Sequence, residues 1–427
     1  MHKLKTRALA IAGGVMGGLM GGFMAMAGVA TAADPVVLNV WSDPVRLTMF
    51  DLYDKTHDNV TLNVTTIDPA GLVAKIQLGM QSKSEVPDVI FMNDIGYAAQ
   101  LSTRRSNYLL DLTGKVPQTT LDEFYPNANG PCYINGKLLC MRNDIAHDVV
   151  WYDKPLMESL GAKVPTTWEE YQALGDELAA KGYSLGSPMV PFESFLVSDG
   201  CDMVMPVEGK DDTVRIDLTT DKCLKPARMI DHMMAAGSLS KVGPFDPAVV
   251  DLVKTGKVPL MVGPTWFGEY VIKPTYEMAP GKLAVALPLK WDDQAQPITW
   301  SWGGGVYGGW KDTKNPAEVA DLITWMSSDV ANQTTAVTLP AHKPSSIAWG
   351  ARLKTDAYYA SPDVFDMQVK AAEYSHPGYV SLRFSVEDAL VKIVSANIAK
   401  GVSIEASLPA LQTELTNLAK LNGYTVE

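Results

Sequence analysis

A short tryptophan- and glycine-rich stretch holds the residues best suited to contact a ligand. Residues 299–310 contain three tryptophans and five glycines. Tryptophan offers a flat apolar face and one N–H donor. Glycine allows close approach of the backbone and unusual dihedral angles. This composition predicts a wall of a ligand-binding cleft near a hinge. If the stretch is a strand, the alternation of side chains puts Trp300 and Trp302 on one face.

Several enzyme motifs are absent or incomplete. Gly303, Gly305 and Gly308 have the spacing of a dinucleotide-binding fingerprint, but no helix opens at the third glycine. The chain has no GxxxxGK[ST] loop and no HExxH pair. Its six histidines are scattered. We therefore expect no cofactor and no catalytic metal.

Paired carboxylates leave one enzymatic alternative open. A glycosidase needs only two Asp or Glu side chains across a cleft, at any separation in sequence. Asp94, Asp144 and Glu193 are candidates for such a pair. Polar ligand contacts are the commoner use of carboxylates in a cleft, so we predict a binding protein and keep a secreted glycosidase as the alternative.

The N-terminus has the pattern of an export signal. Lys3, Lys5 and Arg7 precede an apolar stretch over residues 8–29, and Ala30-Thr31-Ala32 is typical of a cleavage site. We predict a signal peptide over residues 1–32, cleaved near Ala32, and a periplasmic mature protein. An uncleaved membrane anchor is the alternative. A net charge of -12 argues against nucleic acid as a partner.

Four cysteines in an exported chain suggest disulfide bonds. Three pairings are possible. Proximity in sequence favours Cys132 with Cys140 and Cys201 with Cys223. Asn135-Gly136 is a hairpin signal between the first two, although only a three-residue loop would set them directly opposite. Free buried thiols remain the alternative, and no CxxC or neighbouring histidine supports zinc.

The elements that must position these residues alternate between strand and helix. Strands are expected over 36–41, 60–65 and 87–92, with helices over 45–56 and from residue 69. Alternation of this kind predicts a parallel sheet covered by helices, with ligands beyond the carboxyl ends of the strands. Two such ends are polar: Trp41-Ser42-Asp43 and Asn93-Asp94. A second α/β unit follows, so the fold class is α/β with two large domains.

An ordered set of segments resembles the family 1 extracellular solute-binding proteins, the maltose-binding-protein-like class that serves ABC importers. The segments are 72–80 with 87–89, 149–154 with 165–170, 256–261 with 263–266, and 303–305 before 314–316. The resemblance implies a periplasmic binding protein fold of type II, with two α/β lobes joined by three crossing segments. It places an N-terminal lobe at 33–143 and 302–342, and a C-terminal lobe at 144–301 and 343–427. The crossings fall near 142–147, 299–304 and 339–346.

The same resemblance implies the function and the site. The protein would capture a sugar or oligosaccharide between the lobes and deliver it to the membrane permease, without catalysis and as a monomer. A ligand-sensing adaptor on the same scaffold is a further alternative. The implied ligand contacts are Trp41, Ser42, Asp43, Asn93, Asp94, Asp144, Phe192, Trp266, Trp302, Gly303 and Gly304. Arg383 joins them if it faces the cleft, and the ligand would then be anionic, because a guanidinium binds acids bidentately; a surface ion pair is the alternative.

Overall fold

The computed structural model describes residues 35–427 except 69–70, 189–191, 211 and 377–381. These residues belong to one compact unit, Pro35–Glu427. The predicted signal peptide and its cleavage site lie outside the described residues. Among the helices that are described, none has both the length and the apolar character that a membrane crossing requires.

The first lobe is built on a mixed five-stranded sheet with the order β2-β1-β3-β13-β6. Its strands are β1 (Val36–Ser42), β2 (Val60–Thr66), β3 (Val89–Met92), β6 (Met141–Arg142) and β13 (Val306–Gly309). β1 runs parallel to β2 and β3, as the alternating pattern predicted, whereas β13 runs antiparallel to β3 and β6. β13 returns to this sheet after about 160 residues spent elsewhere.

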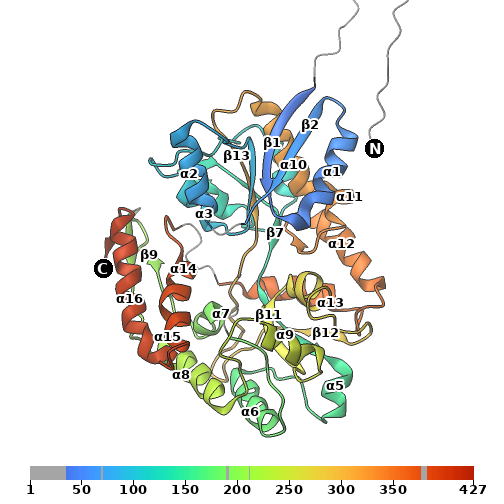
Figure 1. The fold of residues 1–427 in the computed structure, drawn as a ribbon, viewed down its shortest axis with the longest axis vertical. Helices are drawn as coiled ribbons and strands as arrows, with labels where there is room; N and C mark the ends of the chain where they lie inside the picture. The colour runs from blue at the N-terminus through green and yellow to red at the C-terminus, as the bar shows by residue number, and fades with distance from the viewer. Residues whose placement is uncertain (1–34, 69–70, 189–191, 211, 377–381) are drawn as a thin grey trace, which may run out of the picture. The chain divides into compact units, whose positions relative to one another are not determined.

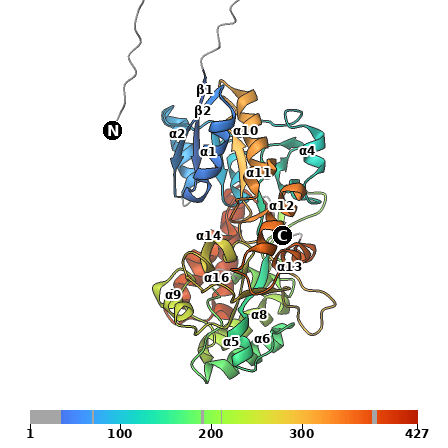
Figure 2. The ribbon, with the colours of Figure 1, turned by 90° about the vertical axis from the view of Figure 1, so that its right-hand side faces the viewer.

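Helices on both sides of this sheet bury its apolar faces (Figures 1 and 2). They are η1 (Pro44–Arg46), α1 (Leu47–Thr56), α2 (Leu72–Ser82), α3 (Gly96–Leu101), α4 (Gln118–Asp122), α10 (Pro316–Ser328) and α11 (Val330–Gln333). α10 and α11 pack beside α1 although they follow it by more than 250 residues. One buried apolar cluster, drawn from residues 38–141 and 306–341, fills this lobe.

The second lobe surrounds a three-stranded sheet in which β8 (Asp148–Asp153) lies between β11 (Leu260–Pro264) and β12 (Leu283–Ala286). Both neighbours are antiparallel to β8. A small sheet of β9 (Met205–Pro206), β10 (Thr213–Arg215) and β15 (Thr425–Val426) joins the last residues of the chain to this lobe. Two further buried clusters fill the lobe, one on each side of β8.

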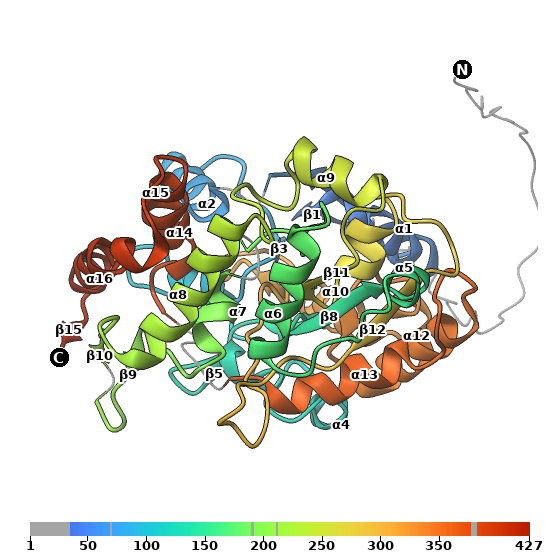
Figure 3. The same ribbon diagram turned by 90° about the horizontal axis from the view of Figure 1, so that it is seen from below.

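The helices of this lobe come from two distant parts of the chain. The first part supplies α5 (Lys154–Ser159), α6 (Trp168–Ala179), α7 (Phe192–Val197), α8 (Asp221–Ala236), α9 (Pro247–Lys254) and η3 (Gly268–Ile272). The second supplies α12 (Lys343–Thr355), α13 (Val364–Ala371), η4 (Ala372–Tyr374), α14 (Val386–Leu390), η5 (Val391–Ser395), α15 (Ala396–Ile398) and α16 (Ile404–Leu421). Figure 3 shows α6 beside α8 and α12 beside α13, and each pair is in contact.

Local signals explain where several helices begin. Thr167 caps α6 by accepting a hydrogen bond from the backbone N–H of Glu170, and the Glu170 carboxylate accepts one from the N–H of Thr166. These bonds form a capping box in which the Glu170 carboxylate accepts from the residue before the cap and not from the cap itself. Asp246 caps α9, where Pro247 occupies the first turn. Ser403 caps α16 in the same way.

Both disulfides follow the pairing predicted from proximity in sequence. Cys132 bonds to Cys140, and Cys201 bonds to Cys223. The hairpin β4 (Tyr133–Ile134) and β5 (Lys137–Leu138) has a two-residue loop, with positive φ at Asn135 and Gly136. The N–H of Leu139 donates to the carbonyl of Cys132, so Cys140 stands one residue beyond the position opposite Cys132, and the disulfide joins these diagonal neighbours at a Cα–Cα distance of 5.0 Å.

The chain passes between the two sheets through segments that lie side by side. β7 (Asp144–Ile145) continues from β6 toward β8 and pairs with β14 (Leu339–Pro340). His147 forms a bridge with Ser301, and the N–H of Asn143 donates to the carbonyl of Gly305. These are the three segments in which the crossings were expected. In Figure 1, β7 lies between the two groups of helices.

Candidate functional site

The predicted polar strand ends are placed beside the crossing segments. Ser42 is the last residue of β1, and Asn93 and Asp94 follow β3. Asn93 is exposed, whereas Asp94 is half-buried. A Cβ added to Gly303 would lie 3.6 Å from the Asn93 carbonyl and 3.6 Å from Trp266 Nε1. The fold therefore brings Asn93, Trp266 and Gly303 together from three distant parts of the sequence.

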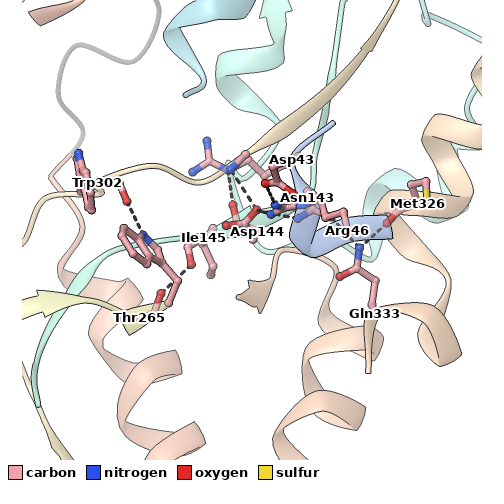
Figure 4. A network of polar contacts seen from close by, with 12 residues as sticks. Asp43, Arg46, Asn143, Asp144, Ile145, Thr265, Trp302, Met326 and Gln333 are labelled. Atoms are coloured by element: carbon pink, nitrogen blue, oxygen red, sulfur yellow. Dashed lines mark hydrogen bonds and ion pairs between the residues drawn. The ribbon is translucent and has the colours of Figure 1, made fainter. Parts of the chain in front are cut away.

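Two half-buried tryptophans form an aromatic pair at this place. The Trp266 and Trp302 ring centroids are 4.7 Å apart, and Trp266 Nε1 donates to the Trp302 carbonyl at 3.0 Å (Figure 4). Tyr270 meets the Trp266 ring edge-on at 5.6 Å. Trp266 follows β11, and Thr265 beside it fixes the turn by donating to the Ile145 carbonyl at 3.0 Å. The pair presents an aromatic surface that is held by the backbone of two crossing segments.

Trp300 does not share a face with Trp302. Its ring is buried in the second-lobe core, and its Nε1 donates to Glu193 Oε2 at 3.1 Å. Trp302 instead packs beside the cluster on the other side of β8. The strand-like alternation expected for this stretch is absent, because Thr299 and Ser301 form only isolated bridges and neither tryptophan is part of a strand. Gly303 and Gly304, which follow, have φ of 86° and 90°.

A small cavity lies against Trp302. Its polar lining consists of Glu193, Glu387 and Ser395, and Phe192 adds a second aromatic ring. Its apolar lining comes from Leu390, Val391, Val394 and Ile398. Phe192, predicted as a contact, and Trp302 thus line one cavity, with a carboxylate from α14 that the sequence reasoning missed.

Glu387 faces other carboxylates across the two lobes. Burial, followed by the charge of Asp94, raises the pKa of Glu387 to about 7. Burial, opposed by the Gly96 N–H at 2.6 Å and reinforced by Asp388, raises the pKa of Asp94 as well. Two desolvated carboxylates near one another each favour the protonated form. A ligand that donates hydrogen bonds would relieve this cost.

Arg46 is a second residue that sequence reasoning missed. It lies in η1, directly after the polar end of β1, and is buried. Its guanidinium pairs with Asp43 and, at 3.4 Å, with Asp144 Oδ1 (Figure 4). Its central carbon stands 3.6 Å above the Phe91 ring. The only indication of this residue in the sequence was a positive charge two positions after Pro44, close to the polar end of β1.

Asp144 is held by protein partners. Its Oδ1 accepts from Asn143 Nδ2 at 2.7 Å and from the Gly305 N–H at 3.1 Å, in addition to the Arg46 contact. Its backbone carbonyl accepts from Arg142 Nε at 2.7 Å. Gly304 sits against that arginine, because an added Cβ would lie 2.0 Å from Arg142 Nη2. Asp144 and Gly304 therefore belong to the crossing itself.

Arg383 and Trp41 lie outside the aromatic pair and cavity. Arg383 pairs with Asp212, donates to the Asn422 carbonyl at 3.2 Å and stacks 4.6 Å above Tyr424. These contacts tie it to the C-terminal residues, in the surface ion pair that is the ordinary role of an exposed arginine. Trp41 is half-buried in β1, with Lys75 Nζ 6.0 Å from its ring.

The site combines stacking surfaces with hydrogen-bond acceptors and contains no evident metal centre. In the described part of the chain, no group of three His, Cys, Asp or Glu side chains could hold a metal ion. Aromatic rings contact the apolar faces of ligands, and the carboxylates accept hydrogen bonds from them. The arrangement is suited to an uncharged, donor-rich small molecule.

Comparisons with known proteins agree with this architecture. The fold is that of two-lobed periplasmic binding proteins. The galacto-N-biose-/lacto-N-biose I-binding protein of an ABC transporter from Bifidobacterium longum superposes with a TM-score of 0.78 at 18% identity, covering 92% of this chain and 99% of that one. A transporter-associated binding protein from B. animalis subsp. lactis, in complex with β-1,6-galactobiose, gives a TM-score of 0.78 at 17% identity, covering 92% and 100%.

Sequence similarity identifies the family. The model of the bacterial extracellular solute-binding proteins matches residues 41–333, and the chain belongs to that family. A multiple sugar-binding protein from Streptococcus mutans is 26% identical over 129 residues, which are 30% of this chain and 29% of that relative's length. The resemblance found in the ordered segments of the sequence is thus confirmed.

Proposed function

We propose that this protein is the periplasmic substrate-binding component of an ABC importer, and that it captures a sugar or oligosaccharide. Family membership supports the binding role, and the names of its relatives support the sugar. The observation that carries the proposal is the Trp266–Trp302 pair beside the acceptor carboxylate Glu387. The partners would be a carbohydrate ligand and the permease, with the protein exported as a monomer after cleavage near Ala32.

The ligand would lie between the lobes, each lobe contributing part of the contact set. We assign the first lobe to residues 33–143 and 302–342 and the second to 144–301 and 343–427. The buried clusters support this division except at Ala336 and Leu339, which pack in a second-lobe cluster. Trp302 and Trp266 would stack on sugar rings, and Asp43, Asp94 and Glu387 would accept from hydroxyls. The remaining contacts would be Trp41, Ser42, Asn93, Phe192 and Gly303. We propose Glu387 as a ligand contact instead of Arg383. Asp144 would contribute through the crossing segment in which it lies.

Binding without turnover is the proposed outcome. A glycosidase would need two free carboxylates flanking the scissile bond. Asp144 Oδ1 is occupied by three donors, and Glu193 accepts from the Trp300 indole. Asp94 is then left without a partner among the three candidates named from sequence, and its pairing with Glu387, which faces it, is what a turnover assay must exclude. Incubation of the protein with a bound oligosaccharide should release no product.

Isothermal titration of the mature protein with lacto-N-biose, β-1,6-galactobiose and maltose tests the proposal. Trp302→Leu should weaken the best of these roughly 2- to 10-fold, because it removes a stacking interaction worth about 0.5–1.5 kcal/mol. Trp325→Leu is the matched control, since Trp325 is half-buried against Tyr53 in the first lobe, away from the aromatic pair. Equal losses in both variants, or binding of none of the sugars, would contradict the proposal.

A further inference from the structure

Arg46 connects the end of β1 to a crossing segment. One end of its guanidinium pairs with Asp43, which directly follows β1. The other end lies 3.4 Å from Asp144 Oδ1, in β7. Both contacts are largely removed from water, since the side chains are 7%, 18% and 3% exposed for Arg46, Asp43 and Asp144. Screening is weak at such burial, so the charges act on one another strongly.

The Asp144 end joins the three crossing segments. Asp144 Oδ1 accepts from the Gly305 N–H at 3.1 Å, and Asp144 pairs with Pro340 in the β7–β14 ladder. The preceding residue adds to the junction: Asn143 Oδ1 accepts from Gln333 Nε2 at 2.9 Å (Figure 4). Asp144 therefore lies in one crossing segment and contacts the other two.

At the Asp43 end, two buried oxygen atoms have unused hydrogen-bonding capacity. Asp43 Oδ1 and the neighbouring Ser42 Oγ are buried, and neither has a hydrogen-bond partner among the described residues. Buried polar atoms without partners are uncommon, and each one costs free energy until a partner arrives. A ligand hydroxyl is a suitable donor for both. Tyr270 of the second lobe also interacts electrostatically with Asp43: burial first, and then the charge of Asp43, raises the pKa of Tyr270.

We propose that Arg46 is a positioning residue that couples ligand contact at Asp43 to the hinge at Asp144; the proposal rests on the proposed binding function. A donor on Asp43 Oδ1 draws charge from the carboxylate and weakens its hold on the guanidinium. Arg46 then moves toward Asp144, whose 3.4 Å contact is longer than the 2.7–2.9 Å typical of charge-assisted pairs. The tightened contact shifts the hinge equilibrium, since a ligand shifts a two-state equilibrium by its differential interaction with the two states.

The first test needs no ligand. Nitroxide labels at Gln81→Cys in α2 and Ala173→Cys in α6 report the distance between the lobes; both positions are exposed, and all four native cysteines are paired. Asp43→Asn imitates the loss of charge. It should shift the distance distribution when Arg46 is present and leave it unchanged in the Arg46→Gln background. The same shift in both backgrounds, or no shift in either, would overturn the coupling.

The second test adds the best sugar from the titration panel. At saturation, the wild-type distribution should move to shorter distances, and Arg46→Gln should bind at least 10-fold more weakly and close incompletely. Arg383→Gln is the matched control, an ion-paired arginine stacked on a ring but remote from the site, and it should behave as wild type. Complete closure by Arg46→Gln would refute the proposal.

Two further measures keep the outcomes distinct. Arg46→Lys retains the charge but lacks the forked guanidinium that reaches both carboxylates. It replaces Arg46→Gln if that variant does not fold. In this background too, Asp43→Asn should leave the distance distribution unchanged. If the wild-type protein binds none of the sugars, the proposed function fails, while the ligand-free experiment still decides whether Arg46 couples the two sites.

Discussion

Replacing Gly304 by alanine should be far more harmful than the same change at Gly303. The two glycines are adjacent in a crossing segment and have nearly equal φ angles, 90° for Gly304 and 86° for Gly303. Their surroundings differ. A Cβ on Gly303 would meet no atom closer than 3.6 Å. A Cβ on Gly304 would lie 2.0 Å from Arg142 Nη2 and 3.2 Å from the Asp144 carbonyl oxygen.

The structure separates two contributions to the loss of stability. The left-handed backbone costs a residue other than glycine about 1–2 kcal/mol, and both variants bear that cost. Gly304→Ala must also displace the buried Arg142 side chain, whose Nε donates to the Asp144 carbonyl at 2.7 Å. Loss of a hydrogen bond to a charged group costs about 1.5–3 kcal/mol. We therefore expect about 1–2 kcal/mol for Gly303→Ala and about 3–5 kcal/mol for Gly304→Ala.

Urea unfolding followed by tryptophan fluorescence and by circular dichroism measures both losses. The wild-type protein, the two single variants and the double variant are compared at one pH. Equal losses for Gly303→Ala and Gly304→Ala would show that Arg142 yields without cost, and would refute the argument that it is fixed by Asp144. A greater loss for Gly303→Ala would contradict the placement of this segment altogether.

Three other outcomes are expected. The stability that protonated Glu387 contributes is fully present below its ordinary pKa of 4.5 and is lost as the pH rises through about 7. Between pH 4.5 and 8, the free energy of unfolding measured in urea should therefore fall by up to about 3 kcal/mol more for the wild type than for Glu387→Gln. Parallel pH profiles of the two proteins would contradict this. Arg383→Gln should leave sugar affinity unchanged in calorimetry, and a tenfold loss would place that arginine in the site. Removing the 201–223 disulfide should lower the free energy of unfolding by about 1 kcal/mol more than removing the 132–140 disulfide, because the two loops span 22 and 8 residues. The reverse order in thermal unfolding would contradict this loop-entropy argument.

The placement of the first-lobe residues of the candidate site could be predicted from sequence because it follows from strand topology. The apolar runs of β1 and β3 identified parallel neighbours, and parallel strands end at one edge of their sheet. The polar residues Ser42, Asp43, Asn93 and Asp94 follow those runs directly. Their position therefore depends only on local pattern and on one general property of parallel sheets.

The second-lobe part could not be read in the same way. Glu387 stands on a five-residue helix whose place is set by packing against α16 and η5, and no periodicity reports such long-range contacts. Its one local signal is Ser385, which caps the helix by accepting from the Asp388 N–H at 3.0 Å. Arg383, two residues earlier, was the more conspicuous charge, but Asp212 and Tyr424 hold it elsewhere. The prediction for Trp300 was wrong because residues 299–302 make only isolated bridges, at Thr299 and Ser301, and lack the strand alternation that would have put Trp300 beside Trp302.

The desolvated carboxylates and the unpaired oxygens of the candidate site indicate which ligands it should reject. Asp94 and Glu387 have raised pKa values because burial and neighbouring carboxylates disfavour their charged forms. Asp43 Oδ1 and Ser42 Oγ are buried without partners among the described residues. An anionic ligand would add like charge to this set, whereas hydroxyl donors would supply what these oxygens lack and would favour their charged forms. Binding of a neutral sugar should therefore lower the pKa of Glu387 and release protons near pH 7, so the heat of binding should depend on the ionisation enthalpy of the buffer.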